Sequence, residues 1–251
     1  MNRESKNITI ETRTSDKVRV DEAQKLIQQG FCEGHAEGGL VLSFLDSHSE
    51  LRRPDTKVGN GFFVNFSSVD RRVGAGNLSK KQPLPRAVGV ENKTIIDTTA
   101  GFCGDAILLA LMGFDVLAIE RSPIISVLLR DAMRRGEEDT LFWKALGNRL
   151  RVVEGNAIEV LQEVTPPDVL YLDPMFPQKK KSSPLPPGHI QLLSHIVGSD
   201  VDTKELFRTA CETKTKRIVV KRPMHADAIG DNLVATHKGK QVRYEVYKPN
   251  N

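Results

Sequence analysis

The sequence has few of the residues that define several classes of protein. Its 251 residues include only three cysteines, Cys32, Cys103 and Cys211, which lie far apart and form no CxxC pair. A disulfide framework and a zinc site are therefore poorly supported, and a reducing cytoplasm is the expected compartment. The six histidines show no HxxxH or HxH spacing, so we expect no metal site.

Long hydrophobic runs are also absent. The longest apolar stretch, residues 106–114, is far too short to cross a bilayer. Residues 1–6 (MNRESK) lead into polar sequence without the apolar core of a signal peptide. With 39% hydrophobic and 27% charged residues, the chain has the composition of an ordinary globular protein. Its length fits one α/β domain with an extension, or two small domains.

The net charge of +4 is small but unevenly distributed. Residues 1–70 hold 9 Lys and Arg against 11 Asp and Glu, whereas residues 71–251 hold 27 against 21. The basic residues of the second part form three clusters: Arg71, Arg72, Lys80, Lys81 and Arg86; Lys179, Lys180 and Lys181; and Lys214, Lys216, Arg217, Lys221 and Arg222. A single cluster is usually a solvated face, but three beside one active site would form a phosphate-binding surface.

From residue 93 onward, short apolar runs alternate with helical patterns, which predicts a parallel sheet covered by helices. We expect strands at 94–97, 116–120, 150–153, 169–172 and 217–221, and helices at 105–112, 123–135, 158–164 and 201–214. Residues 233–237 and 242–247 flank a Lys-Gly-Lys turn and predict a terminal antiparallel hairpin. This order resembles the Rossmann-like mixed sheet of class I S-adenosylmethionine methyltransferases.

The first part of the chain predicts a separate, smaller structure. Strands are expected at 40–44 and 61–66 and a helix at 21–29, which indicates a small α+β unit over residues 1–70. Residues 71–92 would be a basic linker into a catalytic domain over residues 93–251.

Two features predict a nucleoside-containing cofactor. In the turn of residues 97–105 (DTTAGFCGD), Gly101 and Gly104 let a ligand approach the backbone, and the helix that begins at Asp105 offers free amides. Glu120 ends the next strand, 19 positions after Gly101, where an acid can accept both ribose hydroxyls. Arg121 beside it could pack on the adenine or face solvent. A glycine-rich turn or an acid at a strand end is common by itself in α/β proteins. The prediction of a nucleoside-containing cofactor therefore rests on the two features together.

After the third strand, Asn156 and Ala157 occupy a position that can supply the adenine edge with a polar side chain or a backbone amide. Asn156 by itself is more typical of a helix N-cap. Cys103 has no evident base partner and is expected to be a packed residue.

The fourth strand is followed by Asp173-Pro174-Met175-Phe176-Pro177, at the edge where such sheets bind ligands. The lone pair of an exocyclic base amine is delocalised into the ring, so an enzyme that methylates it must hold the NH2 group by hydrogen bonds. Asp173 and the Pro174 carbonyl can accept those two hydrogens, and Phe176 can stack on the base. The alternative is an ordinary Asp-Pro turn with a buried Phe.

Over about residues 59–247 the chain resembles the family of ribosomal RNA small-subunit methyltransferase J, which methylates guanine N2. The resemblance is carried by 61–66 (GFFVNF), 86–89 (RAVG), 97–101 (DTTAG), 120–121 (ER), 169–177 (VLYLDPMFP) and 217–223 (RIVVKRP). The LDPMFP string is more specific than the acid-Pro-Pro-aromatic motif shared by amino methyltransferases.

The resemblance implies S-adenosylmethionine as methyl donor and a guanosine near the 3′ end of 16S rRNA as acceptor. It implies cofactor contacts from Gly104, Asp105, Glu120, Arg121, Asn156, Ala157 and Asp173. The family usually has Leu-Gly-Arg where this chain has Phe102, Cys103 and Gly104, and Ser-Ser in place of Asn156 and Ala157. An arginine contact is therefore lost, and the contacts to the adenine edge are redistributed.

Other functions are compatible with the same fold. An amino methyltransferase could act on adenine N6 or on a protein glutamine, and an RNA-binding assembly factor could keep the fold without activity. The intact Glu120 and Asp-Pro-Met-Phe string argue against a pure binding protein. A dehydrogenase is disfavoured by the missing third glycine of GxGxxG and by the terminal hairpin.

Overall fold

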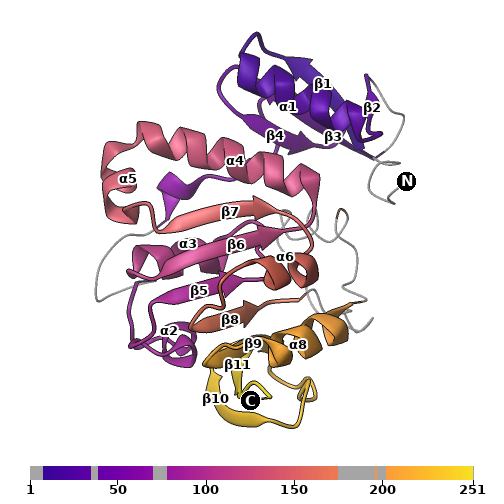
Figure 1. Cartoon of the computed structure of the whole chain (residues 1–251). Coiled ribbons are helices and arrows are strands. Elements are labelled where there is room, and N and C mark those ends of the chain that lie inside the picture. The colour runs from indigo at the N-terminus through magenta and orange to yellow at the C-terminus, as the bar shows by residue number, and fades with distance from the viewer. Residues whose placement is uncertain (1–7, 35–38, 70–77, 175–195, 197–201, 251) are drawn as a thin grey trace.

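A seven-stranded sheet forms the larger part of the molecule (Figure 1). The computed structural model describes residues 8–34, 39–69, 78–174, 196 and 202–250. Five strands run parallel: β5 (Thr94–Asp97), β6 (Asp115–Glu120), β7 (Leu150–Glu154), β8 (Val169–Leu172) and β9 (Arg217–Pro223). The hairpin of β10 (Leu233–Lys238) and β11 (Val242–Tyr247) completes the order β10-β11-β9-β8-β5-β6-β7, with β11 antiparallel to β9.

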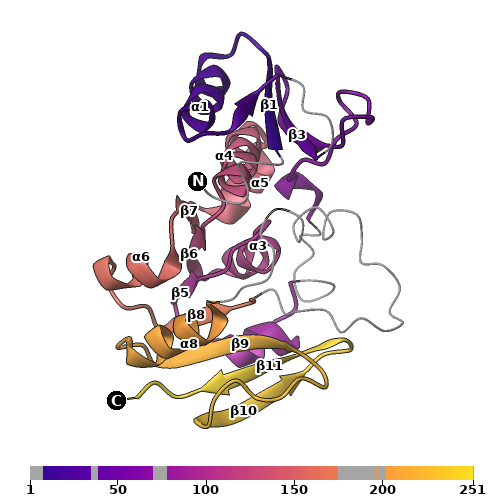
Figure 2. The same ribbon diagram turned by 90° about the vertical axis from the view of Figure 1, so that its right-hand side faces the viewer.

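Helices cover both faces of this sheet (Figure 2). One face carries α2 (Pro83–Val88), α3 (Gly104–Leu111), α4 (Pro123–Glu138) and α5 (Thr140–Leu146), and the other carries α6 (Ala157–Glu163) and α8 (Thr203–Glu212). Every residue of the central strand β8 is buried, because a parallel strand between two helical layers has no solvent face. The expected class I methyltransferase fold is confirmed.

The N-terminal residues form a second sheet with the order β2-β1-β3-β4. Its strands are β1 (Ile8–Arg13), β2 (Cys32–Glu33), β3 (Leu40–Leu45) and β4 (Ser49–Arg52), and α1 (Lys17–Gln28) packs against β1 and β3. A 3-10 turn, η2 (Phe66–Ser68), lies against α4. The α1 helix begins four residues before the predicted start at 21, because the Asp16 side chain caps it by accepting the Arg19 N–H.

The predicted strand at 61–66 is wrong. Only Phe62 pairs there, in an isolated antiparallel bridge with Leu51. The carboxylate of Glu50 accepts the N–H groups of Gly59 at 2.8 Å and Gly61 at 2.7 Å, which fixes an irregular loop. The run is apolar because Val64 and Phe66 belong to the core that joins the two parts of the molecule.

Segment 71–92, expected to be a linker, contains α2, which packs against the hairpin strands β10 and β11. No helix among the described residues combines the length and apolar character needed to cross a membrane.

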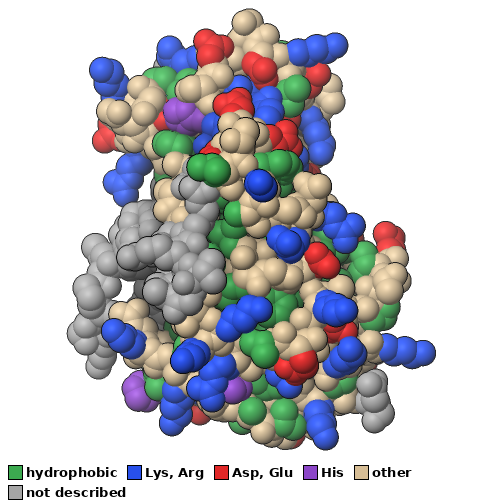
Figure 3. Space-filling model, turned by 90° about the vertical axis from the view of Figure 1, so that its left-hand side faces the viewer, with side chains coloured by type: hydrophobic (Ala, Val, Ile, Leu, Met, Phe, Trp, Pro, Cys, Tyr) green, Lys and Arg blue, Asp and Glu red, His purple; other side chains and the backbone are tan. Residues whose placement is uncertain are grey.

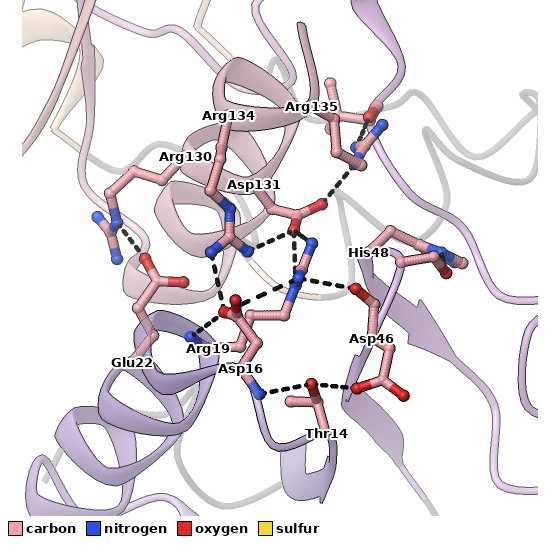
Figure 4. A network of polar contacts seen from close by, with 12 residues as sticks. Thr14, Asp16, Arg19, Glu22, Asp46, His48, Arg130, Asp131, Arg134 and Arg135 are labelled. Atoms are coloured by element: carbon pink, nitrogen blue, oxygen red, sulfur yellow. Dashed lines mark hydrogen bonds and ion pairs between the residues drawn. The ribbon is translucent and has the colours of Figure 1, made fainter. Parts of the chain in front are cut away.

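A buried ion-pair network joins the N-terminal unit to α4 (Figure 4). Asp131 of α4 has no exposed side-chain surface and accepts both the Nε and an Nη2 hydrogen bond from Arg19 of α1. Arg135 donates to the other oxygen of Asp131 at 2.8 Å, and its Nη2 also donates to the Val64 carbonyl. Arg134 bridges Asp131 and Asp16. One carboxylate therefore holds three guanidinium groups at this interface.

We expect Asp131→Ala to destabilise the protein by about 3–5 kcal/mol, because it leaves the buried Arg19 guanidinium without its main counter-ion. Urea unfolding measures the loss. Glu137→Ala, an exposed acid on the same helix, is the matched control and should change stability by less than about 0.5 kcal/mol. Equal stability of the two variants would show that the network contributes nothing.

Candidate active site

A cavity of about 530 Å³ lies at the carboxyl ends of the parallel strands. The residues predicted from the sequence converge on it from four strand ends: Gly101, Gly104, Asp105, Glu120, Arg121, Asn156, Ala157, Asp173 and Pro174 all line the cavity. Phe176 lies outside the described residues, as do Met175 and Pro177. The volume falls in the range of small-molecule sites, about 300–1,000 Å³.

The glycine turn is tied to the end of β6 by Glu120. Gly101 has a φ of 53°, which favours glycine, and its N–H donates to Glu120 Oε2 at 2.8 Å. Ser122 N–H donates to Oε1 at 2.7 Å. Each carboxylate oxygen has a second lone pair, so a ribose could share Glu120 with these amides.

The first turn of α3 leaves room for a ligand next to its backbone. A Cβ added at Gly104, the first residue of α3, would meet no atom of the described residues within 4 Å, so none of these residues covers this helix end. Cys103 before it is fully buried, and burial raises the pKa of its thiol well above the usual value. The interpretation of Cys103 as a packed residue is confirmed.

Three further residues were expected on the adenosine side of the cofactor. Asn156 and Arg121 form contacts within the protein, and Ala157 is packed. Asn156 caps α6 by accepting the Ile158 N–H at 3.0 Å, the role its position favours. Ala157 begins the helix and is buried. Arg121 pairs with Asp202 at 3.1 Å and so links the end of β6 to the start of α8 on the cavity wall.

The part of the cavity next to the Asp-Pro turn contains a cation between two carboxylates. Lys221 Nζ lies 2.8 Å from Asp173 Oδ2 and 2.9 Å from Asp105 Oδ2. Tyr171 OH donates to the same oxygen of Asp105 at 2.5 Å. The two carboxylates raise the pKa of Lys221 far above its usual value against the opposing effect of burial. The Asp173 backbone N–H donates to Thr99 Oγ1 at 2.6 Å, which places the Asp-Pro turn against the glycine turn.

Asp97 lies beneath this cluster and is buried, with 2% of its surface exposed. Burial raises its pKa to about 8, and the charges of Asp105 and Asp173 add to the shift. The Thr99 N–H that it accepts and the charge of Lys221 act in the opposite direction. At neutral pH we therefore expect Asp97 to be protonated.

The sequence reasoning missed Lys221, Tyr171 and Asp97 as site residues. Lys221 was placed in the third basic cluster, whereas the structure puts it in the cavity. Its place beside the Asp-Pro motif follows from the order of the sheet, which sets the strand carrying Lys221 next to the strand that ends before Asp173. Among the described residues, no group of three or more His, Cys, Asp and Glu side chains is arranged to hold a metal ion.

The cavity has the features that an S-adenosylmethionine site requires. Acid at the ribose position, open space at a helix N-terminus and several carboxylates facing a cationic ligand match the chemistry of this donor. The SAM_MT family model of S-adenosylmethionine-dependent methyltransferases matches residues 25–249. The fold and the cavity thus define a class I S-adenosylmethionine-dependent methyltransferase.

Similar proteins show to which family of these methyltransferases the chain belongs. Ribosomal RNA small subunit methyltransferase J from Hydrogenovibrio crunogenus is 37% identical over 238 residues, which cover 92% of this chain and 85% of the relative. The Coxiella burnetii protein of the same name is 35% identical over 253 residues, covering 96% and 97%. A solved S-adenosylmethionine-dependent methyltransferase from Neisseria gonorrhoeae is 27% identical, with a TM-score of 0.72 and coverage of 97% and 96%. The chain belongs to the ribosomal RNA small subunit methyltransferase J family.

The pKa of Asp97 makes stability depend on pH. The unfolded chain loses this proton near the ordinary value of 3.8 and the folded chain near 8, so stability falls as pH rises between the two values. Asp97→Asn removes this loss, so we expect the variant to gain stability relative to the original protein from pH 5 to 8, by at most about 1.4 kcal/mol per pH unit. Urea unfolding at several pH values measures it.

Asp115→Asn, at an exposed position at the start of β6, is the control and should show no such trend. Parallel stability profiles for Asp97→Asn and the original protein would contradict the assignment of a protonated Asp97.

Proposed function

We propose that this protein transfers the methyl group of S-adenosylmethionine to N2 of a guanosine in 16S ribosomal RNA. The observation that carries the proposal is the position of Asp173 and Pro174 in the same cavity as Glu120 and the glycine turn. An amine-binding turn and a nucleoside-binding edge within one cavity allow two substrates to meet. The names of the curated relatives support RNA of the small subunit as the acceptor.

In the proposed reaction, Asp173 and the Pro174 carbonyl each accept one hydrogen of the guanine NH2 group. When bound, S-adenosylmethionine supplies a methyl group on a cationic sulfur. The two hydrogen bonds turn the nitrogen lone pair toward that methyl group, so that the N–C bond forms in line with the breaking C–S bond. The C–S electron pair remains on sulfur, and the proton leaves N2 along the hydrogen bond to Asp173 and passes to solvent.

Lys221 is proposed to be a positioning residue in this reaction. Its 2.8 Å contact holds one oxygen of the Asp173 carboxylate on the β9 side of the cavity and so orients the group. The second contact, to Asp105 in the first turn of α3, links the acceptor side to the cofactor side.

Several further assignments belong to this proposal. Gly101, Gly104, Asp105, Glu120, Arg121, Asn156, Ala157 and Asp173 are proposed as the cofactor-binding residues, and Phe176 is proposed to stack on the base. The division into an N-terminal unit (1–70), a connecting segment (71–92) and a catalytic domain (93–251) is supported by the two separate sheets. Because the substrate is ribosomal RNA, the cytoplasm is the proposed compartment.

Asp173→Ala tests the acceptor site. We expect methyl transfer to fall by about 10²–10³-fold, as for the loss of one preorganised hydrogen-bonding group. Mass mapping of 16S rRNA from a deletion strain should show one unmethylated guanosine, restored by the original gene and not by this variant. Isothermal titration with S-adenosylhomocysteine tests the second role proposed for Asp173, as one of eight cofactor contacts: binding should be largely retained, because the other seven contacts remain.

Retained turnover by Asp173→Ala would overturn its assigned role. A strong loss of cofactor affinity would instead assign Asp173 to the donor side. A methylated adenine or a methylated protein glutamine as the only product would replace the proposed function with one of its alternatives.

Lys221→Met tests the positioning role. Without the cation, nothing holds the Asp173 carboxylate on the β9 side of the cavity and it repels Asp105, so we expect kcat for methyl transfer to fall by about 10–100-fold while KM for RNA changes by less than about threefold. Lys221→Arg keeps the charge and should largely restore kcat. An unchanged kcat in Lys221→Met would show that Lys221 does not act through these carboxylates.

A further inference from the structure

A second hollow, which we call the α2 groove, lies between α2 and the hairpin strand β10. It has a volume of about 710 Å³, and its basic side chains are Lys80, Lys81, Arg86, Arg217 and His237. On the face shown in Figure 3, Lys and Arg side chains gather over the lower part of the molecule, where α2 and β10 lie in Figure 1. The floor is apolar and is formed by Val234, Ala235 and Val246.

Three of these cations are available to a ligand. Lys80, Lys81 and Arg86 are exposed, and within the described part of the chain their side chains form no ion pair or hydrogen bond. The acid of the groove, Glu91, lies 3.8 Å from Arg217, whose other nitrogen donates to the Ala87 carbonyl at the end of α2. The rim therefore carries positive charge that no acid in the described part of the chain neutralises.

The histidine in the groove, His237, lies close to the positive charges of two arginines. His237 points from β10 toward α2 and is half-buried. Burial lowers its pKa, and the nearby charges of Arg86 and Arg217 lower it further. An anion bound in the groove would relieve this repulsion.

The hairpin connects the groove to the active site. Val242, at the start of β11, lines the catalytic cavity and pairs with Pro223 of β9. At the same end of the hairpin, a Cβ on Gly239 would lie 3.9 Å from Pro83, the first residue of α2. A strand of nucleic acid that leaves the cavity over this turn reaches Lys80 and Lys81 next.

We propose that the α2 groove binds the phosphodiester backbone of the RNA next to the target guanosine; this inference rests on the proposed function. An open groove with exposed cations on its rim and an apolar floor suits a chain of phosphates and sugars better than one enclosed anion. Binding there raises the affinity for RNA without touching the methyl acceptor.

Basic residues that are close in the sequence lie on different parts of the structure. The third cluster does not form one surface, because Arg217 and Lys221 lie near opposite ends of β9, about 13 Å apart at the rise of a strand. Lys221 faces the catalytic cavity, Arg222 is buried near Glu245, and Lys216 pairs with Asp168. The first cluster supplies the free charges of the groove, while its Arg71 and Arg72 lie outside the described residues, as do Lys179, Lys180 and Lys181.

The triple variant Lys80→Ala/Lys81→Ala/Arg86→Ala tests the groove in the full-length protein. The probes are 16S rRNA and small subunits purified from a strain that lacks the methylation. We expect RNA affinity, measured by fluorescence anisotropy at about 0.1 M salt, to fall about tenfold or more, and the slope of log K against log salt to decrease by about 2–3. KM for RNA should rise with kcat within about twofold, and the Kd for S-adenosylhomocysteine should not change.

The matched control is Lys17→Ala/Lys144→Ala/Arg151→Ala, which removes the same charge from exposed positions on α1, α5 and β7. The groove is excluded as the binding site if the two triple variants lose the same affinity, or if neither loses any. Absence of methylation by the original protein would overturn the proposed function alone, because the direct binding measurement still decides whether the groove holds RNA.

Discussion

The ammonium group of Lys221 lies between a carboxylate of the glycine-turn helix and a carboxylate of the Asp-Pro turn, and the geometry of the site depends on it. Without the cation, the two carboxylates that face the cavity would repel each other. Without the carboxylates, burying the ammonium group would cost free energy. The cation and the two carboxylates therefore stabilise each other. The register of the sheet sets this contact. Leu172 pairs with Val220, so the next residues along the two strands, Asp173 and Lys221, lie side by side at the carboxyl edge.

Sequence reasoning located the site because of how parallel sheets are built. An apolar run followed by a polar residue marks a strand end, and parallel strands end at the same edge, so Glu120, Asn156 and Asp173 were expected to converge. The same reasoning could not find Lys221. The strand that lies beside β8 is known only from the order of the sheet, and a lysine next to an arginine is typical of a surface. The burial of Asp97 was equally hidden, because the strands that flank it, β6 and β8, come from other parts of the sequence. The strand wrongly predicted at 61–66 failed because a side chain, Glu50, binds the backbone amides that a strand would use.

The α4 helix connects the N-terminal unit to the cofactor edge. Ser122 caps the helix, and its N–H donates to the Glu120 carboxylate. Asp131, nine residues further along and so about 13 Å away at 1.5 Å per residue, binds Arg19 of α1. One rigid element therefore ties the docking of the N-terminal unit to the placement of the acid expected to hold the ribose. A shift of α4 at one end would displace the other end as well. This coupling gives the N-terminal unit a structural role, even though none of its described residues lines the cavity.

The two hollows have opposite charge, and this difference constrains how RNA can bind. The catalytic cavity is lined by the carboxylates of Asp105, Glu120, Asp173 and Asp202, with Lys221 and Arg121 paired to acids among them. Such a lining attracts the cationic methyl donor and repels phosphate. The α2 groove carries free positive charge and attracts phosphate. A nucleotide whose backbone follows the groove can therefore place only its uncharged base in the cavity, with its phosphates left outside. A base inside a duplex cannot do this without leaving the stack, so the target guanosine has to be unpaired or turned out of its helix before its amine can reach Asp173, the acceptor that we propose for it.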